Sequence, residues 1–173
     1  HPKFDEYDAR LRSSPLSEYQ RMCYRRWIAM AATVGGGYMS DFDTFPLKSA
    51  TSGGFGPFPP RKFTVHDAGA VPCLLSGSKS EWERLTERLM TSSASHGGDR
   101  RWSDMHALQD LRRSDPNAMV TVGGVMGAQD LFELAPMRRA SCDQTRGYKA
   151  IHFSHYSIDL GMQYGAIEGA EGR

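Results

Sequence analysis

Apolar residues recur at helical spacing in three segments, each of which follows a serine suited to a helix N-cap. The first helix is expected to begin near Ser14 or Ser17 and to end at the Gly35-Gly36-Gly37 run. The second follows Ser78 and the third follows Ser103. The stripes expected to face the core are Tyr19, Met22, Cys23, Trp27 and Met30 in the first helix, Trp82, Leu85 and Leu89 in the second, and Met105, Leu108 and Leu111 in the third.

Short runs of apolar residues between these helices predict strands. They are residues 38–41, 63–66, 71–76, 119–122 and 150–153. Because strands and helices alternate, we expect an α/β fold, with one mixed sheet flanked by helices in a single domain over 1–173. Residues 1–16 are expected to be irregular, and residues 157–173 to form a flexible tail.

Composition excludes several classes of protein. The 173 residues carry 21 Lys and Arg against 20 Asp and Glu, so the net charge of +1 provides no general attraction for nucleic acid. No apolar run approaches the roughly 20 residues of a membrane span. The three cysteines form no Cys-x-x-Cys pair, which argues against a disulfide framework or a structural zinc site.

The sharpest local motif is Asp41-Phe42-Asp43, at the end of the strand expected over 38–41. Two carboxylates one residue apart can share one hard divalent cation, and oxygen ligands suit Mg²⁺ or Mn²⁺. Such a cation neutralises a diphosphate as a leaving group. The alternative is a pair of solvated turn residues, which is common for such triplets in loops.

The segment around this motif carries, in order, Arg26-Trp27, Gly35-Gly36, Tyr38, Asp41, Asp43 and Pro46. This order resembles glycosyltransferases of the GT-A type, in the families that include initiating mannosyltransferases, capsule-sugar transferases and glucosylating toxins. The resemblance implies that Arg26 and Tyr38 contact a nucleotide-sugar donor, and that Asp41 and Asp43 hold the donor's ribose and the metal on its diphosphate. Arg25 competes for the role of Arg26, and a solvated helix face is the alternative for both.

Three later segments extend the resemblance. Asp104, in Trp102-Ser103-Asp104-Met105-His106, would approach the transferred sugar as a catalytic residue, or would simply favour the helix dipole from the first turn. His152, with His155 as a substitute, would complete the metal shell. Ser76 and Gly77 would line the donor site.

The function implied by the resemblance is transfer of a sugar from a nucleotide sugar to a hydroxyl of a glycan, lipid or protein acceptor, with Mn²⁺ or Mg²⁺ as cofactor. Residues 55–60 would form a lid that excludes water. The chain begins without Met and leaves no room for the opening donor-binding strands of a GT-A domain, so we expect truncation at the N-terminus or an excerpt of a longer protein. The alternative is an inactive GT-A-like relic that binds a protein partner as an assembly subunit.

Overall fold

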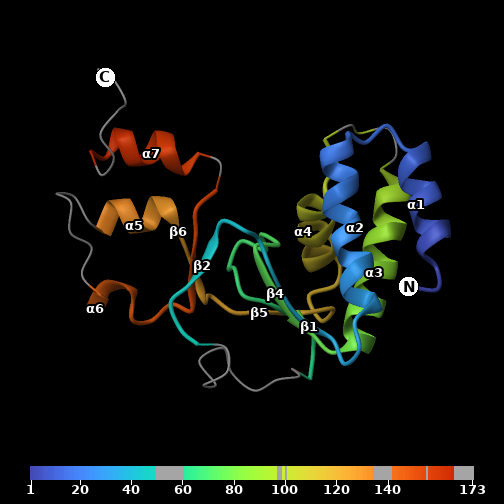
Figure 1. Ribbon diagram of the computed structural model, residues 1–173, viewed down its shortest axis with the longest axis horizontal. Coiled ribbons are helices and arrows are strands. Elements are labelled where there is room, and N and C mark those ends of the chain that lie inside the picture. Colours follow the sequence, from blue (N-terminus) through green and yellow to red (C-terminus); the bar gives the residue numbers. More distant parts are fainter. Residues whose placement is uncertain (50–60, 97–98, 100, 135–141, 155, 166–173) are drawn as a thin grey trace. The chain divides into compact units, whose positions relative to one another are not determined.

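Helices and short strands alternate along the chain in a computed structural model that describes residues 1–49, 61–96, 99, 101–134, 142–154 and 156–165. These residues form seven helices and two small mixed sheets, so the predicted α/β class is confirmed, whereas the expectation of one mixed sheet is wrong (Figure 1). The chain divides into unit 1, His1–Ser40 with Phe58–Val122, and unit 2, Asp41–Pro57 with Gly123–Arg173. The expectation of a single domain over 1–173 stays a prediction.

Unit 1 combines four helices with a four-stranded sheet. The helices are α1 (Phe4–Ser13), α2 (Glu18–Ala32), α3 (Lys79–Ser95) and α4 (Asp104–Ser114), and they lie side by side (Figure 1). The strands are β1 (Gly37–Ser40), β3 (Thr64–Val65), β4 (Leu74–Gly77) and β5 (Val120–Thr121). Their order is β1-β4-β3-β5, in which β4 runs antiparallel to both neighbours and β5 runs parallel to β3.

Three aromatic rings form the centre of the unit 1 core. Trp27 of α2, Trp82 of α3 and Phe63 beside β3 are fully buried, and their ring centroids lie 4.7 to 5.6 Å apart. The sheet adds the buried residues Met39, Val65 and Leu75. Because each buried aromatic side chain removes a large apolar area from water, this cluster fixes α2 and α3 on the sheet.

Three of the serines expected to begin helices, Ser17, Ser78 and Ser103, occupy N-cap positions, whereas Ser14 is the C-cap of α1. The Ser17 hydroxyl accepts the Gln20 amide, and the Gln20 side chain accepts the Ser17 amide in return. The Ser78 hydroxyl accepts the Glu81 amide at the start of α3, and Ser103 precedes α4. These local hydrogen bonds explain why the three helix starts can be predicted from sequence.

The inward face of α2 differs from the expected stripe. Tyr19 and Met22 are 77% and 54% exposed, whereas the helix buries Tyr24, Trp27, Ile28 and Ala31. Both sets follow helical spacing and share Trp27, so periodicity alone does not distinguish them. Tertiary packing against α3 selects the second set.

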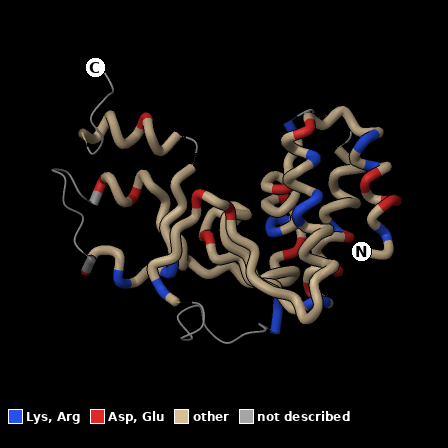
Figure 2. Tube along the Cα trace, in the orientation of Figure 1, with Lys and Arg blue, Asp and Glu red and all other residues tan. Residues whose placement is uncertain are grey.

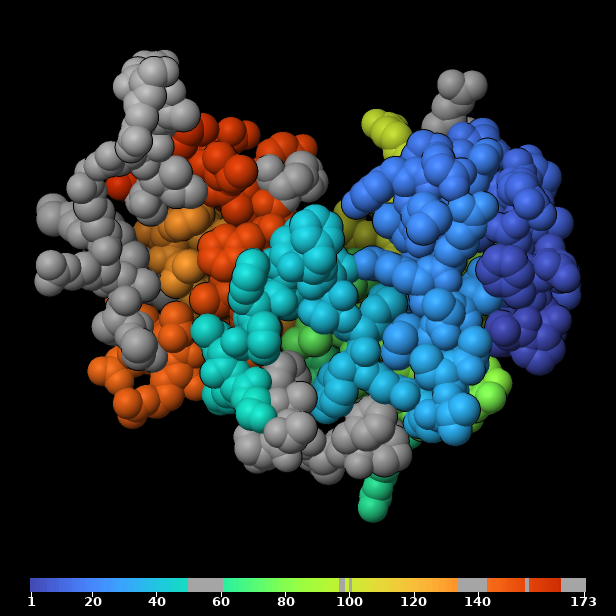
Figure 3. All heavy atoms as spheres, viewed as in Figure 1, coloured from blue at the N-terminus to red at the C-terminus, as the bar shows by residue number. Residues whose placement is uncertain are grey.

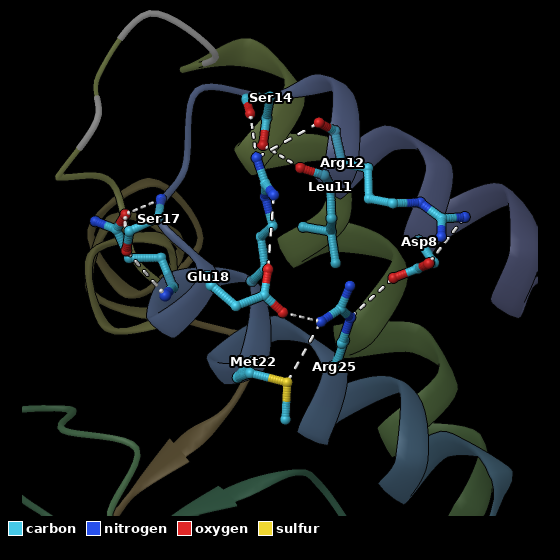
Figure 4. Close-up of polar contacts among 10 residues, drawn as sticks. Asp8, Leu11, Arg12, Ser14, Ser17, Glu18, Met22 and Arg25 are labelled. Atoms are coloured by element: carbon cyan, nitrogen blue, oxygen red, sulfur yellow. Dashed lines mark hydrogen bonds and ion pairs between the residues drawn. The ribbon is translucent and has the colours of Figure 1, made fainter.

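The N-terminal segment, expected to be irregular, forms α1 instead. Tyr7 and Leu11, one turn apart, are each 1% exposed and pack into the unit 1 core. Polar contacts also tie α1 to α2: Asp8 accepts the Arg25 Nε–H at 2.8 Å and pairs with Arg12 at 3.0 Å (Figure 4). Two apolar residues in a polar segment are too short a pattern to predict a helix from sequence. The stability of α1 therefore depends on its packing against the neighbouring helices.

Unit 2 contains a three-stranded sheet in the order β2-β7-β6. The strands are β2 (Thr44–Pro46), β6 (Val125–Gly127) and β7 (Ala150–His152), and the helices are α5 (Ala128–Leu134), α6 (Cys142–Thr145) and α7 (Ser157–Gln163). β7 runs antiparallel to β2 and parallel to β6. Helix α7 lies in the range expected to be a flexible tail, of which 166–173 is outside the described residues.

Charges of both signs are interspersed along the helices of unit 1 (Figure 2). Most of the ion pairs between these charges are exposed. The pair of Glu81 with Arg84, both on α3, is less exposed and connects this helix to the sheet, because Glu81 also binds the backbone at Phe63. Glu81 accepts two hydrogen bonds from Arg84 at 2.7 and 2.9 Å and one from the Phe63 amide at 2.6 Å. Within the described parts of the chain, no helix combines the length and apolar character needed to cross a membrane.

Glu81→Gln is expected to lower the free energy of unfolding by about 2 kcal/mol at pH 7, because it weakens charge-assisted hydrogen bonds at a half-buried site. The Arg84 guanidinium, helped by the Phe63 amide, holds the pKa of Glu81 below its usual value of 4.5. The carboxylate therefore stabilises the fold above its unfolded-state pKa, and this contribution is lost as pH falls through the lower folded-state pKa.

Urea denaturation at pH 7 and pH 3 tests this prediction. The difference in the free energy of unfolding between Glu81→Gln and the wild type should be smaller at pH 3 than at pH 7. The control is Glu83→Gln on the same helix, whose partner Lys79 lies 3.9 Å away with both side chains more than 40% exposed. This control should change stability by less than about 0.5 kcal/mol. Equal effects of the two variants would contradict the assigned role of Glu81.

Candidate metal centre

The two aspartates of the Asp41-Phe42-Asp43 motif lie on a tight turn in unit 2. The Thr44 amide donates to the Asp41 carbonyl oxygen at 3.1 Å, which closes a turn of four residues immediately before β2. The segment that carries the turn and β2 lies at the surface of its unit (cyan in Figure 3). The turn therefore presents both carboxylates from one short piece of backbone.

Strand β7 adds a histidine to the same turn. Thr44 is the register partner of His152, and the Phe153 amide extends the ladder by donating to the Asp43 carbonyl oxygen at 2.9 Å. His152 Nε2 consequently lies 3.6 Å from Asp43 Oδ1. This strand pairing is why residues more than a hundred positions apart in sequence meet at one point.

Asp41, Asp43 and His152 form the cluster that the sequence predicts. Each offers one ligand atom, and these atoms all lie within 4.8 Å of one another. Bonds of about 2.1 Å to an octahedral cation place neighbouring ligand atoms about 3.0 Å apart and opposite ones about 4.2 Å apart. A small inward movement of the side chains would thus suffice to coordinate one cation.

A second observation supports the fit of a cation. Asp43 Oδ1 is buried and accepts no hydrogen bond from the described residues. An orphaned buried acceptor costs about 1–3 kcal/mol, and more when it is charged. Two carboxylates so close also repel each other unless a positive charge lies between them. Two oxygens and one imidazole nitrogen suit Mn²⁺ better than Mg²⁺.

Arg26 and Asp104, assigned to the donor and to catalysis by the resemblance, lie together in unit 1. Asp104 Oδ2 accepts hydrogen bonds from Arg26 Nη2 and from Trp27 Nε1, both at 2.9 Å. The Asp104 side chain is 3% exposed and that of Arg26 is 29% exposed. The competing arginine, Arg25, binds Asp8 and Glu18 instead. Arg25 and Arg26 are therefore each held by a buried aspartate.

Tyr38, Ser76 and Gly77 meet on the unit 1 sheet. Tyr38 is the register partner of Ser76, and Gly77 is the partner of Gly37. Burial raises the pKa of the Tyr38 phenol, which keeps it protonated as a hydrogen-bond donor. An added Cβ at Gly77 would lie 2.9 Å from the Phe63 ring, so packing also requires this glycine.

His66, which was not predicted as a site residue, also lies at this position. Its Nε2 lies 3.0 Å from Ser76 Oγ, its ring lies 6.0 Å from that of Tyr38, and both His66 and Ser76 are 2% exposed. Only the antiparallel pairing of β3 with β4 brings His66 near Ser76, so no local pattern indicates it. The lid expected over 55–60 and the substitute ligand His155 lie outside the described residues.

No known protein family matches this chain, and no curated protein matches it either.

Proposed function

We propose that this chain is a metal-dependent glycosyltransferase with a GT-A-like fold, which moves a sugar from a nucleotide-sugar donor to a hydroxyl of an acceptor. One observation carries the proposal: the turn at Asp41–Thr44 and strand β7 bring two carboxylates and an imidazole within 4.8 Å of one another. The resemblance around this motif supplies the reaction class.

In this proposal Asp41, Asp43 and His152 hold Mn²⁺ or Mg²⁺. When bound, the cation neutralises the diphosphate that leaves the sugar. Asp41 also binds the ribose of the donor. The three side chains are each partly buried, so they can hold an ion while leaving one side open to substrate.

In unit 1, Arg26, Tyr38, Ser76 and Gly77 are assigned to the donor. The Arg26 guanidinium suits a phosphate, because its planar fork binds two oxygens at once. The resemblance assigns Asp104 to the transferred sugar, whereas the burial of its carboxylate supports a positioning role that acts through Arg26.

The reaction breaks the bond between the anomeric carbon and the phosphate oxygen, and the electron pair leaves with that oxygen. The acceptor oxygen forms the new bond to the anomeric carbon, and its proton passes to a base or to the departing phosphate. The alternative function, an inactive relic that serves as an assembly subunit, is favoured by the burial of Asp104.

Asp43→Asn is expected to weaken Mn²⁺ binding about 100-fold, because the variant replaces a charged ligand with a neutral amide. Binding is measured by the loss of the free Mn²⁺ signal in electron paramagnetic resonance. In thermal unfolding, Mn²⁺ with UDP-glucose or GDP-mannose should raise the melting temperature of the wild type with increasing concentration, and that of Asp43→Asn hardly at all.

Asp159→Asn is the control, because Asp159 is an exposed aspartate of the same unit in the first turn of α7. It should bind Mn²⁺ like the wild type. A wild type that binds neither Mn²⁺ nor a nucleotide sugar would overturn the transferase proposal and favour the assembly subunit. Equal loss in both variants would show that general charge, rather than this cluster, attracts the ion.

A further inference from the structure

Thr44 has a hydroxyl group that is not among the three candidate ligands of the metal centre. The residue is 7% exposed, follows Asp43 directly and is the register partner of His152. Its Oγ1 atom is buried and makes no hydrogen bond with any described residue. The site therefore holds two neighbouring orphaned oxygens, Asp43 Oδ1 and Thr44 Oγ1.

The side chain of Thr44 shares a sheet face with that of His152. Register partners in an antiparallel pair present their side chains on the same face, with Cβ atoms about 4.5–5.5 Å apart. His152 Nε2 lies 3.6 Å from Asp43 Oδ1, so His152 contacts Asp43 and is also the strand partner of Thr44. The Thr44 side chain thus stands on the sheet face that also carries His152, one of the three residues of the cluster.

The burial of this hydroxyl needs a physical reason. A strand position that needs only a buried β-branched side chain is satisfied by valine, and a threonine there costs about 1–3 kcal/mol while its hydroxyl has no partner. The neighbouring Asp43 Oδ1 also accepts no hydrogen bond from the described residues, which adds a cost of the same kind. One ligand that accepts lone pairs from both oxygens would remove both penalties, and a cation is such a ligand.

We infer that Thr44 is a fourth protein ligand of the cation site, with Oγ1 as a neutral oxygen donor beside the Asp41 and Asp43 carboxylates and the His152 imidazole. This inference rests on the proposed function, whose metal it concerns. A neutral hydroxyl adds coordination without adding negative charge, which leaves the cation more of its positive charge to attract a diphosphate.

Thr44→Val tests the inference, because valine keeps the shape and removes only the hydroxyl. With Mn²⁺ alone as the probe, titration followed by electron paramagnetic resonance should show about tenfold weaker binding in Thr44→Val and nearly unchanged binding in Thr44→Ser. Without metal, the melting temperature of Thr44→Val should equal or exceed that of the wild type, because the orphaned hydroxyl is gone. A purely structural role of Thr44 predicts no change in Mn²⁺ affinity.

Thr64→Val is the matched control, because Thr64 is also a strand threonine but its hydroxyl donates to the Lys62 carbonyl oxygen at 3.1 Å. It should leave Mn²⁺ affinity unchanged. If Thr44→Val does not fold, Thr44→Ala provides the same comparison with Thr44→Ser.

Two outcomes separate this inference from the proposed function. Wild-type affinity in Thr44→Val, combined with loss of binding in Asp43→Asn, would overturn the role of Thr44 and leave the metal centre intact. A wild type that binds no Mn²⁺ would overturn both.

Discussion

Gly36→Ala is expected to lower the free energy of unfolding of this protein by about 2–5 kcal/mol. Gly36 has φ of +86°, where an L side chain costs about 1–2 kcal/mol. An added Cβ would also lie 2.3 Å from the Gly77 carbonyl oxygen and 2.6 Å from the Lys79 nitrogen. Both atoms belong to backbone at the junction of β4 and α3, so the clash can be relieved only by shifting the sheet edge, at a further cost of about 1–3 kcal/mol.

The neighbouring residue gives a matched control. Gly35 has a nearly identical φ of +84°, but an added Cβ meets nothing within 4 Å. Gly35→Ala should therefore cost only the conformational penalty of about 1–2 kcal/mol. Urea denaturation of both variants measures the difference, which isolates the close approach to β4. Equal losses of stability would show that the backbone here moves freely, contrary to the packing described.

The helices that could be predicted from sequence are those whose starts are determined locally. Ser17 and Ser78 cap α2 and α3 through hydrogen bonds to residues three positions later, so the signal and its cause lie within one turn. Helix α1 has no comparable signal, because it is held by Tyr7 and Leu11 against other helices. The face of α2 was predicted poorly for the same reason, since two overlapping stripes fit its periodicity.

Strand β2 shows a different limit of prediction. Pro46 and the two aspartates indicate a break in regular structure, yet Thr44–Pro46 pairs with β7. Proline is compatible with this position because β2 is an edge strand. Whether a three-residue segment becomes a strand depends on a distant partner, which the sequence nearby does not encode.

The candidate site likewise has some features that are visible in the sequence and others that depend on contacts between distant residues. The spacing of Asp41 and Asp43 is compatible both with a shared cation and with solvated turn residues, and the turn that closes at Thr44 presents the two side chains together. His152 was expected only from the resemblance, and its approach depends on the register of β2 and β7. The Thr44 hydroxyl was not expected to lack a partner among the described residues, because this is a property of packing and cannot be seen in the sequence.

Asp104→Asn is expected to cost about 3 kcal/mol of stability, because the Asp104 carboxylate is the buried partner of Arg26 and also accepts the Trp27 indole N–H. The amide can still accept from Trp27 but no longer neutralises the guanidinium. If Asp104 positions Arg26 for the donor, the variant should also bind UDP-glucose or GDP-mannose about tenfold more weakly, measured by calorimetry below its melting temperature.

Asp8→Asn separates the two effects, because Asp8 is also buried and holds the adjacent arginine of α2, Arg25. Its loss of stability should resemble that of Asp104→Asn, whereas its affinity for the nucleotide sugar should equal that of the wild type. If both variants weaken nucleotide binding equally, the effect arises from loosening of α2 and Asp104 has only a structural role. If Asp104→Asn keeps full affinity and stability but loses turnover, its carboxylate contacts the sugar, as the resemblance implies, and the positioning role is overturned.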